Sequence, residues 1–219
     1  MTLNKEYDYI FMDLDGTITD PMIGITKSIQ YSLKHFGINV EDINTLTKFI
    51  GPPLKDTFNL YYGFNEEKTV EAIEKFRERF ASVGLFENDV YEGMEKFLKS
   101  LKDRGKTLMV ATSKPKFFAE KILDHFGLSK YFTFIGGSNM DETRSKKSEV
   151  IEYVLSENNI TDLSNVVMIG DREHDIIGAK EFNIDSIGVL YGYGNYNELK
   201  EAGATYIVKD LDELLKIIV

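Results

Sequence analysis

The order of hydrophobic and polar residues changes character twice along the chain. Residues 7–12 form an apolar run rich in β-branched and aromatic side chains, which indicates a buried strand. Over residues 18–87 the apolar positions recur with helical spacing, as at Ile25, Ile29 and Leu33, and nothing there predicts a strand. After this segment, short apolar runs alternate with helical stretches. The pattern therefore predicts a helical insert that follows the first strand.

The alternating part predicts a parallel sheet. We expect its strands at residues 107–111, 132–135, 166–169, 186–189 and 206–208. We expect its helices at residues 93–102, 117–126, 146–158, 175–182, 197–202 and 211–217. The insert predicts further helices at 41–49, 54–61 and 66–82. Strands that alternate with helices imply right-handed crossovers and a sheet covered on both faces. The expected fold class is α/β, a doubly wound parallel sheet with an inserted all-helical cap.

The expected domain division follows from the same change of pattern. Residues 1–17 and 88–219 form the predicted α/β core, and residues 18–87 form the predicted cap. The cap is inserted just after the first strand, at the carboxyl edge of the sheet. Ligands of open α/β sheets bind at that edge, so the cap is placed to act as a lid.

Polar residues follow each of the main predicted strands. They are Asp13 and Asp15 after the first, Thr112 and Ser113 after the second, Lys146 and Lys147 after the third, and Asp171 and Asp175 after the fourth. The carboxyl ends of parallel strands converge on one crevice. Four carboxylates in one pocket cannot all stay ionised without a cation. Mg²⁺ is a hard ion that takes oxygen ligands and suits a site that also holds a phosphate.

Each of these residues also has a purely local interpretation. Thr112 and Ser113 are equally suited to cap a helix, and Asp175 is suited to cap the helix that begins there. Lys146 competes with Lys147 for a place in the crevice. Lys55 in the insert is either a substrate contact or a solvated side chain.

Composition narrows the function classes. The chain has 219 residues, a formal net charge of −10 and no cysteine. The negative charge disfavours nucleic acid as a partner, and the lack of cysteine excludes disulfides and thiolate metal sites. No run approaches the roughly 20 apolar residues of a membrane helix, and the N-terminal residues have no apolar signal region. We expect a cytoplasmic protein with no membrane partner, and the composition specifies no oligomeric state.

The four motifs in this order resemble the haloacid dehalogenase superfamily of aspartate-dependent phosphohydrolases. Asp13-Leu14-Asp15-Gly16-Thr17 resembles its first motif, Thr112 its second, Lys147 its third, and Gly170-Asp171 with Asp175 its fourth. The insert is similar to the small helical cap of the phosphoglycolate phosphatase-like branch. Within it, Phe49–Leu54 resembles the cap loop of that branch. The usual Pro after the third-motif Lys is missing here.

The resemblance implies a role for each residue. Asp13 would attack phosphorus and form an aspartyl-phosphate, and Asp15 would act as general acid and then as general base. Thr112 would hydrogen-bond a phosphoryl oxygen, and Lys147 would offset negative charge. The implied Mg²⁺ ligands are Asp13, Asp15 (through its backbone carbonyl) and Asp171, with Asp175 either a ligand through water or a residue that orients the ligands. The expected substrate contacts are Gly16, Ser113 and Lys55.

The expected function is Mg²⁺-dependent hydrolysis of a small phosphorylated metabolite that resembles phosphoglycolate. Asp15 disfavours the dehalogenase branch, which does not need an acid at that position. A 5′-nucleotidase and a phosphosugar mutase of the same superfamily remain open, because the motifs do not report the leaving group. A non-catalytic binding protein is disfavoured because both Asp13 and Asp171 are present.

Overall fold

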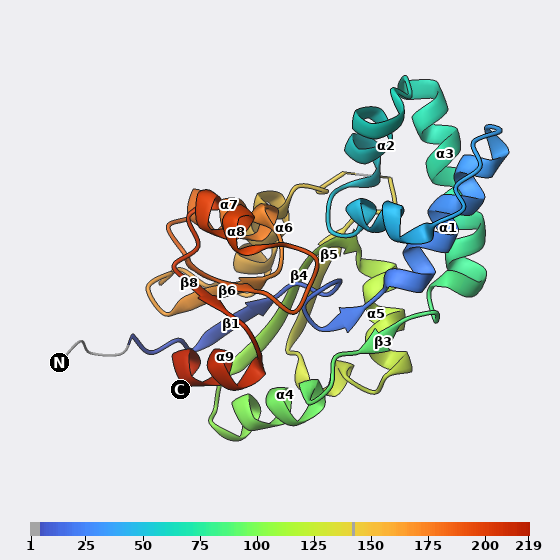
Figure 1. Ribbon diagram of the computed structural model, residues 1–219. Coiled ribbons are helices and arrows are strands. Elements are labelled where there is room, and N and C mark those ends of the chain that lie inside the picture. Colours follow the sequence, from blue (N-terminus) through green and yellow to red (C-terminus); the bar gives the residue numbers. More distant parts are fainter. Residues whose placement is uncertain (1–4, 142) are drawn as a thin grey trace.

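A six-stranded parallel sheet forms the centre of the molecule (Figure 1). The structure is a computed structural model that describes residues 5–141 and 143–219. The strands are β1 (Tyr9–Met12), β4 (Thr107–Pro115), β5 (Phe134–Ser138), β6 (Val166–Gly170), β7 (Asp185–Val189) and β8 (Tyr206–Val208). Their order is β5-β4-β1-β6-β7-β8, with every neighbouring pair parallel. The predicted doubly wound α/β class is confirmed.

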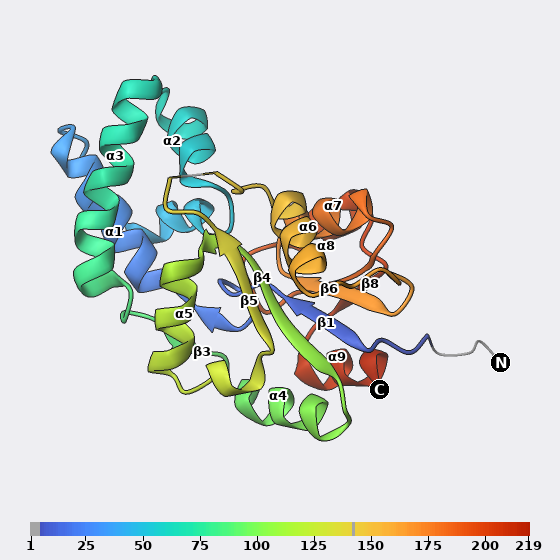
Figure 2. The ribbon, with the colours of Figure 1, turned by 180° about the vertical axis from the view of Figure 1, so that it is seen from behind.

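Helices cover both faces of the sheet (Figures 1 and 2). Helices α4 (Met94–Asp103), α5 (Lys116–His125) and α9 (Leu211–Ile218) pack on one face. Helices α6 (Lys147–Glu157) and α7 (Glu173–Glu181) pack on the other, with α8 (Tyr196–Ala202) against α7. Ile10 and Met12 of β1 belong to the first core and Phe11 to the second, as the alternation of a strand requires. None of the described helices is both long enough and apolar enough to cross a membrane.

The insert is a group of helices beyond the carboxyl edge of the sheet (Figures 1 and 2). It contains α1 (Met22–His35), the 3₁₀ helix η1 (Ile43–Phe49), α2 (Leu54–Tyr62), α3 (Glu66–Arg79) and the π-helical turn η2 (Phe80–Gly84). Phe49 and Phe58 are buried there, whereas Tyr61 is 46% exposed. The buried aromatic side chains of the insert belong to the same hydrophobic cluster as Ile10 and Met12 of β1, so the insert and this face of the sheet share one core.

Two strands differ from the expected pattern. Thr19–Asp20, in the range expected to be helical, form β2 and pair antiparallel with β3 (Asp89–Val90). The two places where the chain passes between sheet and insert therefore lie side by side. Strand β4 continues to Pro115, beyond its expected end, with a register shift after Ala111. The domain boundaries at 17/18 and 87/88 stay a prediction.

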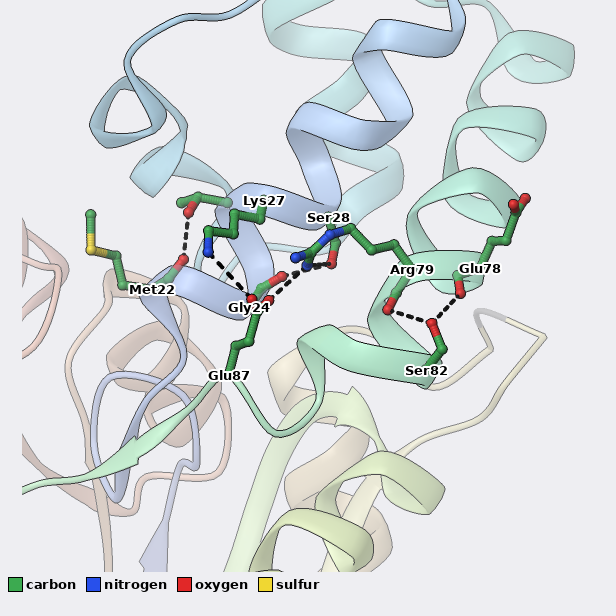
Figure 3. Close-up of polar contacts among 9 residues, drawn as sticks. Met22, Gly24, Lys27, Ser28, Glu78, Arg79, Ser82 and Glu87 are labelled. Carbon is green, nitrogen blue, oxygen red and sulfur yellow. Dashed lines mark hydrogen bonds and ion pairs between the residues drawn. The ribbon is translucent and has the colours of Figure 1, made fainter.

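The base of the insert is tied together by one carboxylate (Figure 3). Glu87 accepts hydrogen bonds from Lys27 Nζ at 3.3 Å and Arg79 Nη1 at 2.8 Å. Arg79 also donates to Ser28 Oγ, and the Gly24 N–H donates to the Glu87 carbonyl. The start of α1, the end of α3 and the return to the core are thereby connected.

Candidate active site

The end of β1 presents the first two carboxylates. The Asp13 N–H donates to the Ile169 carbonyl at 2.9 Å, which extends the pairing of β1 with β6 by one residue. The Leu14 carbonyl then accepts the N–H groups of Ile18 and Thr19, so the chain turns sharply. Asp13 and Asp15 are 4% and 7% exposed. The pair lies at the carboxyl end of a central strand, as the sequence predicted.

Gly16 allows this turn to approach the fourth motif. Its φ is +82°, and a Cβ built there would lie 2.3 Å from Asp171 Oδ2. Its N–H donates to the Thr19 carbonyl at 2.8 Å. The role that the structure shows for Gly16 is close packing against a metal-ligand candidate. The predicted substrate contact at Gly16 stays a prediction.

Asp171 and Asp175 are positioned by the end of β6 and the first turn of α7. Asp171 is fully buried and accepts hydrogen bonds from Thr17 Oγ1 at 3.3 Å and from the Tyr193 N–H at 2.8 Å. Asp175 Oδ2 accepts the Arg172 N–H at 3.1 Å. Asp175 therefore stabilises the start of α7 and faces the crevice at the same time.

Lys147 contacts residues of three separate parts of the core. Its Nζ lies 2.9 Å from Asp13 Oδ1 and 2.7 Å from Asp175 Oδ1, and it donates to the Ala111 carbonyl at 3.0 Å. Burial alone would lower the pKa of Lys147, but Asp13 and Asp175 outweigh it and the pKa is raised. Lys147 is buried and Lys146 is exposed, so the structure places Lys147 in the crevice.

The carboxylates form a cluster suited to a cation. One oxygen each of Asp13, Asp171 and Asp175 lies within 4.8 Å of the other two. Burial and the neighbouring carboxylates raise the pKa of Asp171 well above its usual value. Burial likewise raises the pKa of Asp175, to about 6, with Lys147 opposing and Asp13 adding to the shift. The negative charge is thus poorly compensated, and the all-oxygen donor set fits a hard divalent ion.

Lys114 is a site residue that the sequence analysis did not single out. Its Nζ lies 2.5 Å from Asp15 Oδ2, and its N–H donates to Thr112 Oγ1 at 3.2 Å. Burial raises the pKa of Asp15, and Lys114 opposes that shift. The Asp15 carboxylate is outside the three-carboxylate cluster, and the metal contact predicted for its backbone carbonyl stays a prediction. The signal in the sequence was a Lys two residues beyond Thr112.

A cavity of about 80 Å³ adjoins Asp15 between core and insert. The core contributes Ser113 and Lys114 to its lining, and the insert contributes Arg77. Its apolar lining includes Ile25, Phe49, Leu54, Phe76, Phe80 and Phe118. Lys55 does not line this cavity, because it lies on the exposed surface and pairs with Glu66 at 3.3 Å. The structure therefore brings Ser113 to the site and leaves Lys55 away from it.

The fold and the site together define a phosphatase. Residues 10–189 match the model of the haloacid dehalogenase-like hydrolases, and the chain belongs to this family. It is similar to the crystal structure of a predicted phosphatase from Clostridium acetobutylicum, with 53% identity, a TM-score of 0.95, and coverage of 97% of this chain and 98% of that one.

The relatives differ in the activity that their names give. The chain is 43% identical to a 5′-nucleotidase of Pseudomonas aeruginosa over 97% of its own length and 96% of the relative's. It is 26% identical to a phosphoglycolate phosphatase of Colwellia psychrerythraea, over 96% of each chain. The resemblance expected from the four motifs is confirmed at the level of the family.

Proposed function

We propose that the protein hydrolyses a small phosphate monoester in a Mg²⁺-dependent reaction that passes through an aspartyl-phosphate on Asp13. The contact that carries this proposal is the pair of ion pairs from Lys147 to Asp13 and Asp175. It holds the nucleophile against the fourth motif, where Asp171 completes the carboxylate cluster.

Asp13 is oriented for attack on phosphorus. Its Oδ1 accepts the Leu14 N–H at 2.7 Å and lies against Lys147 Nζ. We assign the attack to the other oxygen, Oδ2. The Oδ2–P bond forms as the bond from phosphorus to the leaving oxygen breaks. Lys147 offsets the negative charge on the transferred phosphoryl group, and the Thr112 hydroxyl donates a hydrogen bond to one of its oxygens.

Asp15 handles the protons of both steps. In the first step it donates a proton to the leaving alkoxide. In the second step its carboxylate takes a proton from the water that attacks the aspartyl-phosphate, which regenerates Asp13 and releases phosphate. Asp15 lines the cavity next to the crevice, where a leaving group would lie.

The metal would be held by the carboxylates of Asp13, Asp171 and Asp175 and by the Asp15 backbone carbonyl. Two buried ammonium groups, Lys114 and Lys147, face four buried carboxylates, which leaves a formal charge of −2. When bound, Mg²⁺ would offset this charge and polarise the phosphoryl group.

The size of the cavity favours a small leaving group. The cavity beside Asp15 measures about 80 Å³, which supports a small leaving group next to the phosphoryl group. Lys114 and Arg77 contribute cationic side chains to the lining of this space, and a phosphoglycolate-like ester is the first candidate substrate. A 5′-nucleotidase is the second candidate, supported by the 43% identity to a relative of that name. A nucleoside would need the insert to open further.

Phosphate release from a panel of phosphoesters tests the proposal. The panel contains phosphoglycolate, nucleoside monophosphates, sugar phosphates and pyrophosphate, each with Mg²⁺ and with EDTA. We expect release that requires Mg²⁺ and is fastest with phosphoglycolate. Preference for a nucleoside monophosphate would select the second candidate. Release that is unchanged by EDTA, or none from any compound, would contradict the proposal.

A further inference from the structure

Arg172 connects the core directly to the insert. It follows Asp171 at the end of β6, and its Nη1 donates to the Ile50 carbonyl at 2.6 Å. Its Nε donates to Glu198 Oε1 in α8 at 2.8 Å. Ile50 is distant in sequence from both places where the chain enters and leaves the insert. The guanidinium therefore joins the two parts at a point other than the paired strands β2 and β3.

The contact is well defined on the core side. The Arg172 and Glu198 side chains are 16% and 17% exposed. Glu198 Oε1 also accepts the Glu173 N–H at 3.0 Å, which fixes the carboxylate against the first turn of α7. A largely buried, planar guanidinium with two directed hydrogen bonds loses both when its plane is displaced. Arg172 is thus held in one orientation by the core.

The insert side of the contact is shaped to fit Arg172. Gly51 has a φ of +102°, and a Cβ built there would lie 2.9 Å from Arg172 Cγ. The loop therefore lies directly on the Arg172 side chain. The following residues, Pro52, Pro53 and Leu54, line the cavity beside Asp15. Arg172 therefore holds the loop that covers the cavity.

A contact at Ile50 acts on the whole insert. Phe49 packs on Phe58 of α2, with ring centroids 5.1 Å apart, so the loop is fixed to the helices. At the other end, Glu87 ties Lys27 of α1 to Arg79 of α3 (Figure 3). A rotation of the insert about the β2–β3 pair would therefore carry the loop away from Arg172.

We propose that Arg172 is a positioning residue that stabilises the insert in a closed position over the cavity. Glu198 fixes the guanidinium to the core, and the Ile50 carbonyl is the group of the insert that it binds. Arg172 does not touch the reacting atoms. It sets the fraction of molecules whose cavity is covered before substrate arrives. This inference rests on the phosphatase activity only for its kinetic consequence.

The closed fraction can be measured directly, because the chain has no cysteine. Leu60→Cys in α2 and Glu181→Cys in α7 place two spin labels on exposed positions of insert and core. The distances between the two spin labels are then measured without substrate. We expect Arg172→Gln to move the distribution to longer and broader distances. Arg172→Lys should do the same, because an ammonium lacks the fork that reaches both partners. Glu198→Gln should give a smaller shift in the same direction.

Kinetics provide the second measurement. When only a fraction of molecules is binding-competent, apparent affinity falls by that fraction. We expect Arg172→Gln to raise KM by about tenfold and to leave kcat within about twofold, since saturating substrate restores closure. The matched control is Arg104→Gln, an exposed arginine at the end of α4, which should match the unsubstituted chain in both measurements.

Two results would overturn the proposal. A wild-type distance distribution in Arg172→Gln would show that the contact is structural only, even if the melting temperature falls. A fall in kcat with unchanged KM and distances would assign Arg172 to the chemistry instead. The distances are recorded without substrate. If they contradict the role of Arg172, the proposed hydrolysis still stands, and if the protein shows no hydrolysis, the distance measurement still tests the role of Arg172.

Discussion

Lys114 Nζ lies 2.5 Å from Asp15 Oδ2, and the two side chains are only 7% and 10% exposed. The carboxylate of Asp15, which is proposed as the acid and base, therefore forms an ion pair with a buried ammonium group. Burial raises the pKa of Asp15 and Lys114 opposes the rise. The balance between these two effects sets the pH range in which Asp15 can act as a base.

Replacing Lys114 should shift this range upward. Lys114→Met removes a cation that lowers the pKa of Asp15, so Asp15 stays protonated to higher pH. The second step needs the Asp15 carboxylate, so the acidic limb of the kcat profile should move to higher pH. General acid–base catalysis is worth about 10² to 10⁴-fold, which bounds the loss at low pH. Lys116→Met, at a more exposed lysine paired with Glu120, is the control. Superimposable profiles for Lys114→Met and wild type would disprove this role.

The adjacent lysines of the third motif should behave very differently. Lys147→Met leaves Asp13 and Asp175 without their shared counter-ion, whereas Lys146 is exposed. Breaking a buried ion pair costs about 3–5 kcal/mol, so urea denaturation should show a clear loss of stability. Phosphate release should fall by about 10²-fold or more, because the charge that stabilises the transferred group is gone. Lys146→Met should keep both properties; equal losses in the two variants would refute the assignment.

Substitution of two glycines distinguishes the cost of backbone strain from the cost of crowding the site. Gly16 and Gly37 both have positive φ, +82° and +76°. A Cβ at Gly16 would overlap Asp171, whereas a Cβ at Gly37 would meet no atom within 4 Å. Gly37→Ala should therefore cost about 1–2 kcal/mol of unfolding free energy with normal activity. Gly16→Ala should cost more and also weaken Mg²⁺ binding, measured by calorimetry. Normal Mg²⁺ binding in Gly16→Ala would contradict the packing role.

Protons and Mg²⁺ should compete for the carboxylate cluster. The pKa of Asp171 is raised, and that of Asp175 is raised to about 6. Without metal, the folded state then binds more protons than the unfolded chain above about pH 4, the usual range for Asp. The free energy of unfolding contributed by these groups is therefore highest at low pH and falls as pH rises through about 4 to 6.

Thermal denaturation at two pH values checks this linkage. At about pH 7.5, Mg²⁺ at roughly 100 times its Kd should raise the melting temperature by about 5–10 °C. At about pH 5 the rise should be smaller, because protons already occupy the cluster. Asp171→Asn should lose most of the rise at the higher pH. A rise that is equal at both pH values would contradict the pKa shifts.

The main strands were predictable because they are apolar and short. Runs such as Val166–Ile169 mark a buried strand wherever it lies in the sheet. The polar continuation of β4 through Thr112–Pro115 was not predictable, because residues at the rim of a sheet carry no apolar alternation. The strand at Thr19–Asp20 was missed for a similar reason: two residues are too few to show a period, and their partner Asp89–Val90 is far along the chain.

Site residues that directly follow a strand were predictable from the sequence. Residues whose orientation depends on long-range packing were less predictable. Spacing placed Asp13, Asp171 and Asp175 correctly at one edge, but it could not say which of Lys146 and Lys147 turns inward. Lys55 was expected near the substrate, and its exposed pairing with Glu66 depends on how α2 is oriented. The contact of Arg172 with Ile50 joins residues 122 positions apart, and local sequence carries no trace of it.

The central claim is that Asp13 carries the phosphoryl group during turnover, and trapping that group tests it most directly. Enzyme mixed with Mg²⁺ and the best phosphoester of the panel is quenched in acid within one turnover and mapped by mass spectrometry. We predict one phosphoryl group on the peptide containing Asp13, none in Asp13→Asn, and no phosphate release by that variant although it folds normally. A phosphoryl group on another residue, or hydrolysis that survives in Asp13→Asn, would contradict the account.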